Sequence, residues 1–437
     1  MTTRRRVCLL AGSAAAVAAF LVVIPGRRGW FDVSVYHAAV RQWLFGHGGI
    51  YDYVVPGKPY GFTYPPFAAV CMVPLAVVGR YAAIALMVSV SIVAAGLICY
   101  WLVDPIARRH GWSRWFTVGV AGCLFAAYGP TRDTISFGQV NLILLAIVLA
   151  DQRFLVGRGH WLGGIGIGLA AAIKLTPAVF IGYLLLTGKR RAAGVAAATA
   201  VGATALAALI APGSSWTFWT SALWQTDRVG QLSYVSNQSL MGLVARLDPV
   251  HPSRILWALA IVAVLSVWAY RSRAAVASGQ DGVAFALACV VACLLSPVTW
   301  VHHLVWLLPA LALLFDAGLR AGARRARAAL LGAAGLAYVI LSSSLVWLWS
   351  TGPGVADHPA GLTGFLGSNA YVWVCLGLLL LLPRQTAAAP TDEFVAGRWS
   401  TRATTEEAET DDRIRDPDLH DRGTRSDPQL RPAAGRQ

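Results

Sequence analysis

The chain has 437 residues, of which 57% are hydrophobic and 13% charged, with a formal net charge of +15 and a mean hydropathy of +0.58. A soluble domain of this composition would expose far more apolar surface than water tolerates, so the sequence predicts a polytopic membrane protein. The basic residues lie mainly in short loops between apolar runs. The positive-inside rule explains that pattern, which argues against a nucleic-acid partner.

About twelve apolar spans follow one another, long enough or nearly long enough to cross a hydrocarbon core of roughly 30 Å. They are expected at about residues 7–25, 81–103, 115–128, 139–151, 161–173, 177–187, 191–211, 254–270, 283–297, 300–316, 328–350 and 370–383. Several are short, which predicts broken or tilted helices beside a cavity, because irregular backbone is tolerated only where protein or water covers it. Placing the basic loops inside predicts that both termini are cytoplasmic.

The predicted fold class is therefore all-α, with interfacial helices over residues 33–44 and 65–78 on the outer face. Residues 1–383 are expected to form one membrane-embedded domain. Residues 384–437 are polar and mixed in charge, which predicts a disordered cytoplasmic tail.

Carboxylates are scarce in the apolar part of the chain, since ten aspartates and no glutamate precede Pro383. Asp32 follows the first span, so the topology places it outside. It directly precedes the amphipathic stretch 33–44, and one interpretation is a helix cap. The other is a proton acceptor that faces a cavity, and the two roles are compatible.

The same topology gathers polar, aromatic and cationic side chains at the outer face. The substrate-binding candidates are Tyr36, Tyr64, Gln139, Asn141, Asp227, Tyr234, Asn237, Gln238 and Trp300. Lys174, Arg132 and Arg228 are candidates for holding an anionic phosphate. Alternatively, Lys174 snorkels to the interface, and Arg132 forms a local ion pair with Asp133.

His302 and His303 are adjacent, and on a helix their side chains would point roughly 100° apart, so one of them is expected to face the cavity. The sequence leaves open which one does. A metal site is disfavoured because no partner at i+4 and no carboxylate cluster accompanies the pair. A hydrogen bond to a phosphate or a sugar hydroxyl is the preferred interpretation, and no metal or other cofactor is predicted.

Six segments together carry a resemblance: DVSVYHAA, FTYPPFAAV, FGQVNLILL, AAIKLTPAVF, TDRVGQLSYVSNQS and SPVTWVHH. Over roughly residues 25–310 the chain resembles the glycosyltransferase family 87 mannosyltransferases of the actinobacterial envelope. The resemblance implies a GT-C membrane fold, a polyprenyl-phosphate-mannose donor, and an α-1,2 linkage to a phosphatidylinositol mannoside or lipomannan-type acceptor. It also implies that Asp32 is the catalytic base and that the outer-face histidine contributes to the active site.

A transporter or flippase of a lipid-linked sugar is the alternative function, because it would also be polytopic and line a cavity with polar groups. Such a protein is expected to carry charges near the bilayer midplane and paired repeats, whereas the charges here gather near one face. A non-catalytic scaffold would leave the outer aspartate, lysine and histidines without a role.

Overall fold

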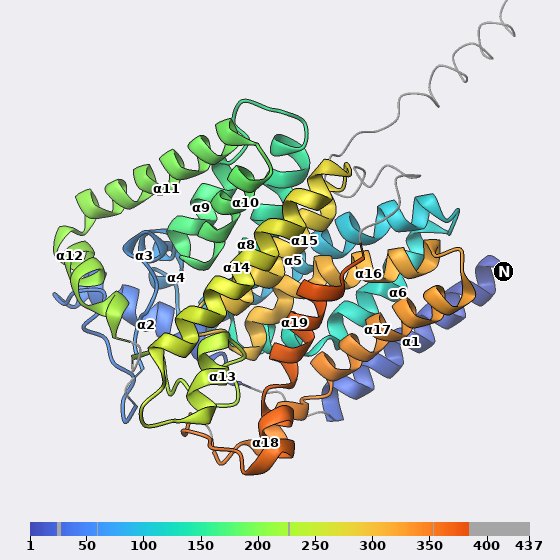
Figure 1. Ribbon diagram of the computed structural model, residues 1–437. Coiled ribbons are helices and arrows are strands. Elements are labelled where there is room, and N and C mark those ends of the chain that lie inside the picture. Colours follow the sequence, from blue (N-terminus) through green and yellow to red (C-terminus); the bar gives the residue numbers. More distant parts are fainter. Residues whose placement is uncertain (24–27, 59, 226–227, 353, 384–437) are drawn as a thin grey trace, which may run out of the picture. The chain divides into compact units, whose positions relative to one another are not determined.

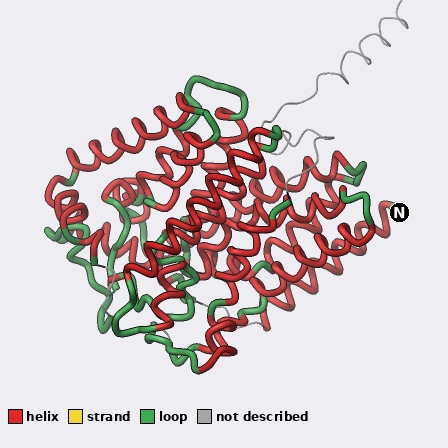
Figure 2. Tube along the Cα trace, in the orientation of Figure 1, coloured by secondary structure: helices red, strands yellow, loops and turns green. Residues whose placement is uncertain are grey.

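The computed structural model describes residues 1–23, 28–58, 60–225, 228–352 and 354–383, and it is built from helices (Figure 1, Figure 2). In chain order they are α1 (Thr3–Val23), α2 (Phe31–Phe45), α3 (Pro66–Cys71), α4 (Val73–Ala76), α5 (Arg80–Arg109), α6 (Arg114–Ala127), α7 (Gly129–Phe137), α8 (Asn141–Ala150), α9 (Ile165–Ile173), α10 (Val179–Leu186), α11 (Arg190–Ile210), α12 (Pro212–Thr220), α13 (Leu240–Leu247), α14 (Arg254–Ala277), α15 (Asp281–Leu295), α16 (Leu308–Arg320), α17 (Arg324–Ser342), α18 (Gly361–Ser368) and α19 (Ala370–Leu381).

Shorter helical turns connect several of these helices. They are the π-helical turn η1 (Asp151–Val156) and the 3-10 turns η2 (Thr176–Ala178), η3 (Ala222–Trp224), η5 (Val301–Leu307) and η6 (Leu345–Trp349). The described residues form no strand, only two isolated β-bridges, Val54 with Gly61 and Asn237 with Trp300. The predicted all-α class is confirmed. The expected tail, residues 384–437, lies outside the described residues.

Six segments are long and apolar enough to cross a membrane: α1, α5, α11, α14, α17, and η5 continued by α16. Two bent pairs raise the number to eight: α7 with the segment Asn141–Val156, bent by 114°, and α18 with α19, bent by 65°. Every expected span coincides with a helix, but α6, α9, α10 and α15 are shorter. By length the spans therefore number six to eight, not about twelve.

The core of this bundle is α15, whose side chains from Gly282 to Leu294 are all buried. A helix that is apolar on every side can satisfy that burial only at the centre of a bundle. It packs against α10, α14, α16, α19 and η5. Among the peripheral helices, α1 has no buried residue and packs on α6, at one side of the bundle in Figure 1.

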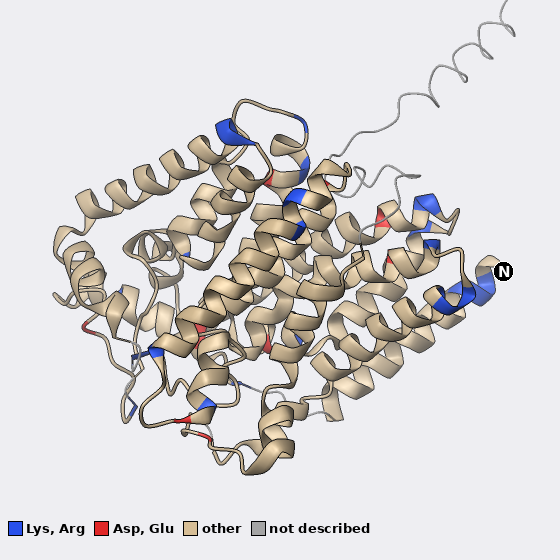
Figure 3. Cartoon of the chain, in the orientation of Figure 1, with Lys and Arg blue, Asp and Glu red and all other residues tan. Residues whose placement is uncertain are grey.

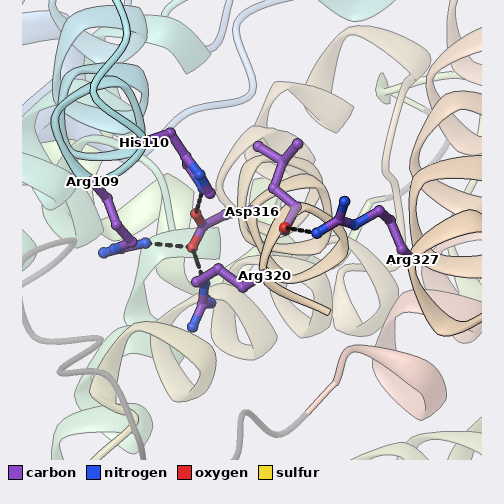
Figure 4. A network of polar contacts seen from close by, with 6 residues as sticks. Arg109, His110, Asp316, Arg320 and Arg327 are labelled. Carbon is purple, nitrogen blue, oxygen red and sulfur yellow. Dashed lines mark hydrogen bonds and ion pairs between the residues drawn. The ribbon is translucent and has the colours of Figure 1, made fainter. Parts of the chain in front are cut away.

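Asp316 of α16 is a buried aspartate at the centre of a cluster of ion pairs, which joins the ends of two helices (Figure 4). Its Oδ2 lies 2.6 Å from Arg109 Nη1 at the end of α5 and 2.9 Å from Arg320 Nη2. His110 Nε2 lies 3.6 Å from Oδ1. A buried carboxylate requires such partners, so this cluster is a structural tie between α5 and α16.

A break between α7 and α8 brings polar residues into the bundle. Gly138 ends α7 with φ 69°, a left-handed conformation that glycine adopts without strain. A Cβ atom at this position would lie 2.5 Å from Val33 Cγ1, next to Asp32. The turn therefore packs directly on the start of α2 and directs Gln139 toward it.

Gly138→Ala is expected to lower the midpoint of thermal unfolding in detergent. The left-handed conformation alone costs an L-residue about 1–2 kcal/mol, and the contact with Val33 adds to that cost. The control is Gly122→Ala in α6, where a Cβ atom would meet nothing within 4 Å. That change should be neutral or slightly stabilising, because alanine favours helix more than glycine does. Equal midpoints for the two variants would contradict this view of the turn.

Candidate active site

Asp32 is the second residue of α2, and the start of this helix is fixed by Trp30. Trp30 is left-handed, with φ 52°, and its N–H donates to the Ser136 carbonyl of α7 at 2.9 Å. Trp30, not Asp32, holds the capping position, and no side-chain bond caps the helix. The structure thus gives the capping interpretation no support. Asp32 Oδ2 is buried and has no hydrogen-bond partner in the part of the chain that the structure describes.

The environment of Asp32 favours the protonated carboxyl group. Burial raises the pKa of Asp32 to about 7, although a hydrogen bond from the Gln139 side chain and the charge of Lys174 both lower it. A carboxyl group with such a pKa can gain and lose a proton near physiological pH, as a general base must.

The remaining aspartates of the described chain are engaged elsewhere. Each is held by a cation or by backbone N–H groups: Asp52, Asp104, Asp133, Asp151, Asp248, Asp281, Asp316 and Asp357. Asp227 lies outside the described residues. Among the described aspartates, Asp32 has neither kind of partner, so its carboxyl group is the one available for proton transfer.

Two amide side chains at the α7–α8 break connect Asp32 to the rest of the site. Gln139 Oε1 accepts hydrogen bonds from Tyr64 Oη at 2.9 Å, from Asn141 Nδ2 at 3.2 Å and from the Val140 N–H at 3.2 Å. These donors fix the orientation of the Gln139 amide, so its nitrogen is the end that can donate to Asp32. Tyr36 Oη donates to Tyr64 Oη at 2.9 Å and supports the arrangement.

Lys174 follows α9 and extends into the same network. Its Nζ lies 3.0 Å from Asn141 Oδ1 and 3.1 Å from His303 Nε2, and 5.2 Å from the centre of the Tyr64 ring. These inward contacts oppose the snorkelling alternative. Burial lowers the pKa of Lys174, and the Asp32 charge only partly offsets this effect.

The two histidines have different surroundings. His303 contacts Lys174 and lines a small cavity together with Asn141, Thr176, Cys293 and Thr299. His302 is buried, packs on the Phe137 ring with centroids 4.8 Å apart, and leaves both ring nitrogens without partners. Of the two, His303 is therefore the one placed beside Lys174.

Asn237 and Gln238 form structural contacts around the outer loops. Asn237 Nδ2 donates to the carbonyls of Leu232 and Pro297, and its Oδ1 accepts from the Thr299 N–H at 2.9 Å. Gln238 Nε2 donates to the Val235 and Ser368 carbonyls, and its Oε1 accepts from α19 N–H groups. These bonds hold the segment before His303 in place. A direct substrate contact for either amide stays a prediction.

Tyr234 and Trp300 lie in an aromatic group with Trp347, a residue that is not among the candidates predicted from the sequence. Ring centroids are 6.1 Å apart for Tyr234 and Trp300 and 5.7 Å apart for Tyr234 and Trp347. Arg28 lies over the Trp347 ring at 4.6 Å and forms an ion pair with Asp133 at 3.4 Å. Trp347 lies within the expected span 328–350. The run of apolar residues in that span gives no sign that α17 ends at Ser342.

The structure does not bring Arg132 and Arg228 to Lys174. Arg132 donates to the Ser342 carbonyl at 2.8 Å and lies over the Phe20 ring, and Asp133 pairs with Arg28 instead of Arg132. Arg228 donates to the Tyr51 carbonyl at 2.5 Å. Their phosphate-binding role stays a prediction without support from these contacts. Within the described ranges, no three His, Cys, Asp or Glu side chains are grouped as a metal site requires.

Comparisons with known proteins show the family of this chain. The family model of glycosyltransferase family 87 matches residues 62–297. The chain is 30% identical over 394 residues to a polyprenol-phosphate-mannose-dependent alpha-(1-2)-phosphatidylinositol mannoside mannosyltransferase of Mycobacterium tuberculosis, covering 86% of this chain and 89% of that protein. It is 34% identical over 358 residues to a polyprenol-phosphate-mannose-dependent alpha-(1-2)-phosphatidylinositol pentamannoside mannosyltransferase of Mycolicibacterium smegmatis, covering 78% and 82%. No solved structure matches significantly. The chain belongs to glycosyltransferase family 87.

Proposed function

We propose that this membrane glycosyltransferase moves mannose from polyprenyl-phosphate-mannose to a phosphatidylinositol mannoside or lipomannan-type acceptor and forms an α-1,2 linkage. The names of the relatives support this donor, acceptor and linkage. One structural observation carries the proposal: a half-buried aspartate, whose buried Oδ2 has no partner among the described residues, is joined through two amides to Lys174. The family supports glycosyl transfer and gives no support to the transporter alternative.

The chemistry follows from the charges of Asp32 and Lys174, which lie at the two ends of the hydrogen-bond network through Gln139 and Asn141. A β-linked lipid-phosphate mannose is attacked by an acceptor hydroxyl from the opposite face, which gives the α linkage by inversion in one displacement. Asp32 Oδ2 takes the hydroxyl proton as the new bond forms. Lys174 and the neighbouring His303 stabilise the negative charge that develops on the leaving phosphate oxygen.

We further propose that the site faces the extracytoplasmic side and that both termini are cytoplasmic. Basic residues gather at the end of the bundle where α1 begins, as Figure 3 shows. In the positive-inside pattern that end is cytoplasmic. Asp32 follows α1, so it lies at the opposite end of this span.

The first prediction concerns the base. Purified protein in liposomes should transfer labelled mannose from polyprenyl-phosphate-mannose to a defined phosphatidylinositol mannoside, with an α-1,2 bond found by linkage analysis of the product. Asp32→Asn should reduce the rate by about 10²–10⁴, because the amide cannot accept the proton.

The matched control is Asp52→Asn, at an exposed aspartate that accepts a hydrogen bond from the Gly49 N–H. It should keep activity close to that of the wild type. Full activity of Asp32→Asn would remove Asp32 from the chemistry, and an inactive wild type would contradict the proposed reaction itself.

The second prediction is a bell-shaped pH profile of kcat, which reports the enzyme with its donor bound. The rate should fall on the acid side as Asp32, with its pKa raised to about 7, becomes protonated and stops acting as a base. It should fall on the alkaline side because Lys174, whose pKa burial lowers, loses its charge. The apparent midpoints belong to the coupled pair. Lys174→Arg should keep the acid limb and lose the alkaline limb. A profile that is flat between about pH 6 and pH 9 would contradict both assignments.

The third prediction assigns Gln139 a positioning role. Gln139→Met removes a hydrogen bond that lowers the pKa of Asp32, so the acid limb should move to higher pH in addition to any loss of kcat. The control is Gln152→Met, at a buried glutamine whose amide has no partner. Its acid limb should match that of the wild type. An unshifted acid limb in Gln139→Met would leave Gln139 a merely structural role.

A further inference from the structure

The position of the proton on His303 is fixed by its neighbours. The Trp300 N–H, which can only donate, lies 3.2 Å from Nδ1. Nδ1 must therefore accept, and the neutral imidazole carries its proton on Nε2. A doubly protonated ring is excluded by the same contact, because it would place two N–H groups against each other. Nε2–H thus points at Lys174 Nζ, 3.1 Å away.

This contact determines the charge state of Lys174. An ammonium group has three donors and no lone pair, so it cannot accept the Nε2–H of His303. A neutral amine has two hydrogens and one lone pair. It can accept from His303 while it donates to Asn141 Oδ1 at 3.0 Å. The amide orientation of Asn141 is settled independently, since its Nδ2 donates to Gln139 Oε1.

The surroundings of Lys174 favour the same state. The titratable groups that act on it or contact it are Asp32, Tyr64, Cys293, His302 and His303, and Tyr36 lies behind Tyr64. Burial lowers the pKa of Lys174 to about 7 and raises the pKa of Asp32 to about 7. Both shifts favour a neutral acid and a neutral amine over an ion pair whose members are separated by two amides.

We propose that the empty site holds a protonated Asp32 and a neutral Lys174, and that binding of the anionic lipid phosphate moves the shared proton to Lys174. Asp32 is therefore a carboxylate, and able to act as a base, only when the donor is bound. The inference rests on the proposed function for the identity of the phosphate. The phosphate oxygen replaces the lysine as the acceptor of the Nε2–H of His303, and the new ammonium group donates to the phosphate.

The protons balance over one turnover. On donor binding, Asp32 loses one proton to solvent and Lys174 gains one from it, so the site has no net change. During transfer, the Asp32 carboxylate takes the proton of the acceptor hydroxyl as the new C–O bond forms and the bond from the sugar to the phosphate oxygen breaks. The leaving lipid phosphate, now a dianion, takes the proton of the Lys174 ammonium and departs as a monoanion. Asp32 is then protonated and Lys174 neutral, as at the start.

The test counts protons in Asp32→Asn, where Lys174 has no aspartate at position 32 to share a proton with. The probe is farnesyl methyl phosphate, a phosphodiester that carries one negative charge and no sugar to transfer. Calorimetry at pH 8 in two buffers of different ionisation enthalpy should show uptake of about one proton per bound ligand. Asp32→Asn combined with Lys174→Arg should bind the probe without proton uptake, because the guanidinium group is already charged.

The wild type gives a second readout, which reports the protonation state of Asp32 itself. Its infrared difference spectrum on binding the probe should lose the carbonyl band of a protonated carboxyl group, and this loss should be absent in Asp32→Asn. The inference alone would be overturned if Asp32→Asn bound the probe without proton uptake and the wild type did not lose that band. Lys174 would then already be an ammonium before the probe binds. Failure of the probe to bind to any form of the protein would instead reject the phosphate site and, with it, the proposed donor.

Discussion

The structure depends on one constraint: among the described residues, no cation and no backbone N–H group bonds to the Asp32 carboxyl group, which lies inside the protein. Every other described aspartate has such a partner, and Asp316 with its two arginines shows what a structural acid in this protein looks like. Asp32 has an unpaired Oδ2 and one amide neighbour. Desolvation, only partly offset by the Gln139 hydrogen bond and the charge of Lys174, keeps the pKa of Asp32 close to the value that reversible proton transfer needs.

Breaks in helices bring the partners of this carboxyl group together. Asp32 begins α2, Gln139 and Asn141 stand at the 114° bend, Lys174 follows the end of α9, and His303 lies in the 3-10 turn after α15. Side chains in the middle of a long helix would be separated by the helix diameter and by the packing between helices. Irregular backbone buried by neighbouring helices lets polar groups from distant parts of the sequence meet, as membrane proteins permit only in such protected places.

The sequence predicted much of this arrangement because Asp32, Gln139, Asn141 and Lys174 lie at the ends of apolar runs, where hydropathy and the charge of the loops are informative. It could not predict the directions of long side chains. Arg132 and Arg228 lie in segments that resemble or adjoin the family motifs, but their guanidinium groups bond to the carbonyls of Ser342, at the end of α17, and of Tyr51. The direction of such a side chain depends on tertiary contacts that leave no periodic signal.

The number of spans and the aromatic group of Tyr234, Trp300 and Trp347 also could not be predicted from the sequence. Hydropathy counts α6, α9, α10 and α15 as spans, although each has fewer residues than a full crossing needs. It also cannot detect where α17 ends and the turn with Trp347 begins. Ser344 has φ 59°, a conformation that the surrounding apolar run does not suggest. The choice between His302 and His303 likewise required coordinates, because it depends on which ring reaches Lys174 Nζ.

The most direct measurement is a structure of the Asp32→Asn protein in a lipid nanodisc, with polyprenyl-phosphate-mannose and a phosphatidylinositol mannoside both bound. We expect a phosphate oxygen within hydrogen-bond distance of Lys174 Nζ and an acceptor hydroxyl against the side chain of residue 32, on the opposite face of the mannose ring. A donor phosphate held at Arg132 or Arg228, with residue 32 far from both sugars, would contradict this expectation.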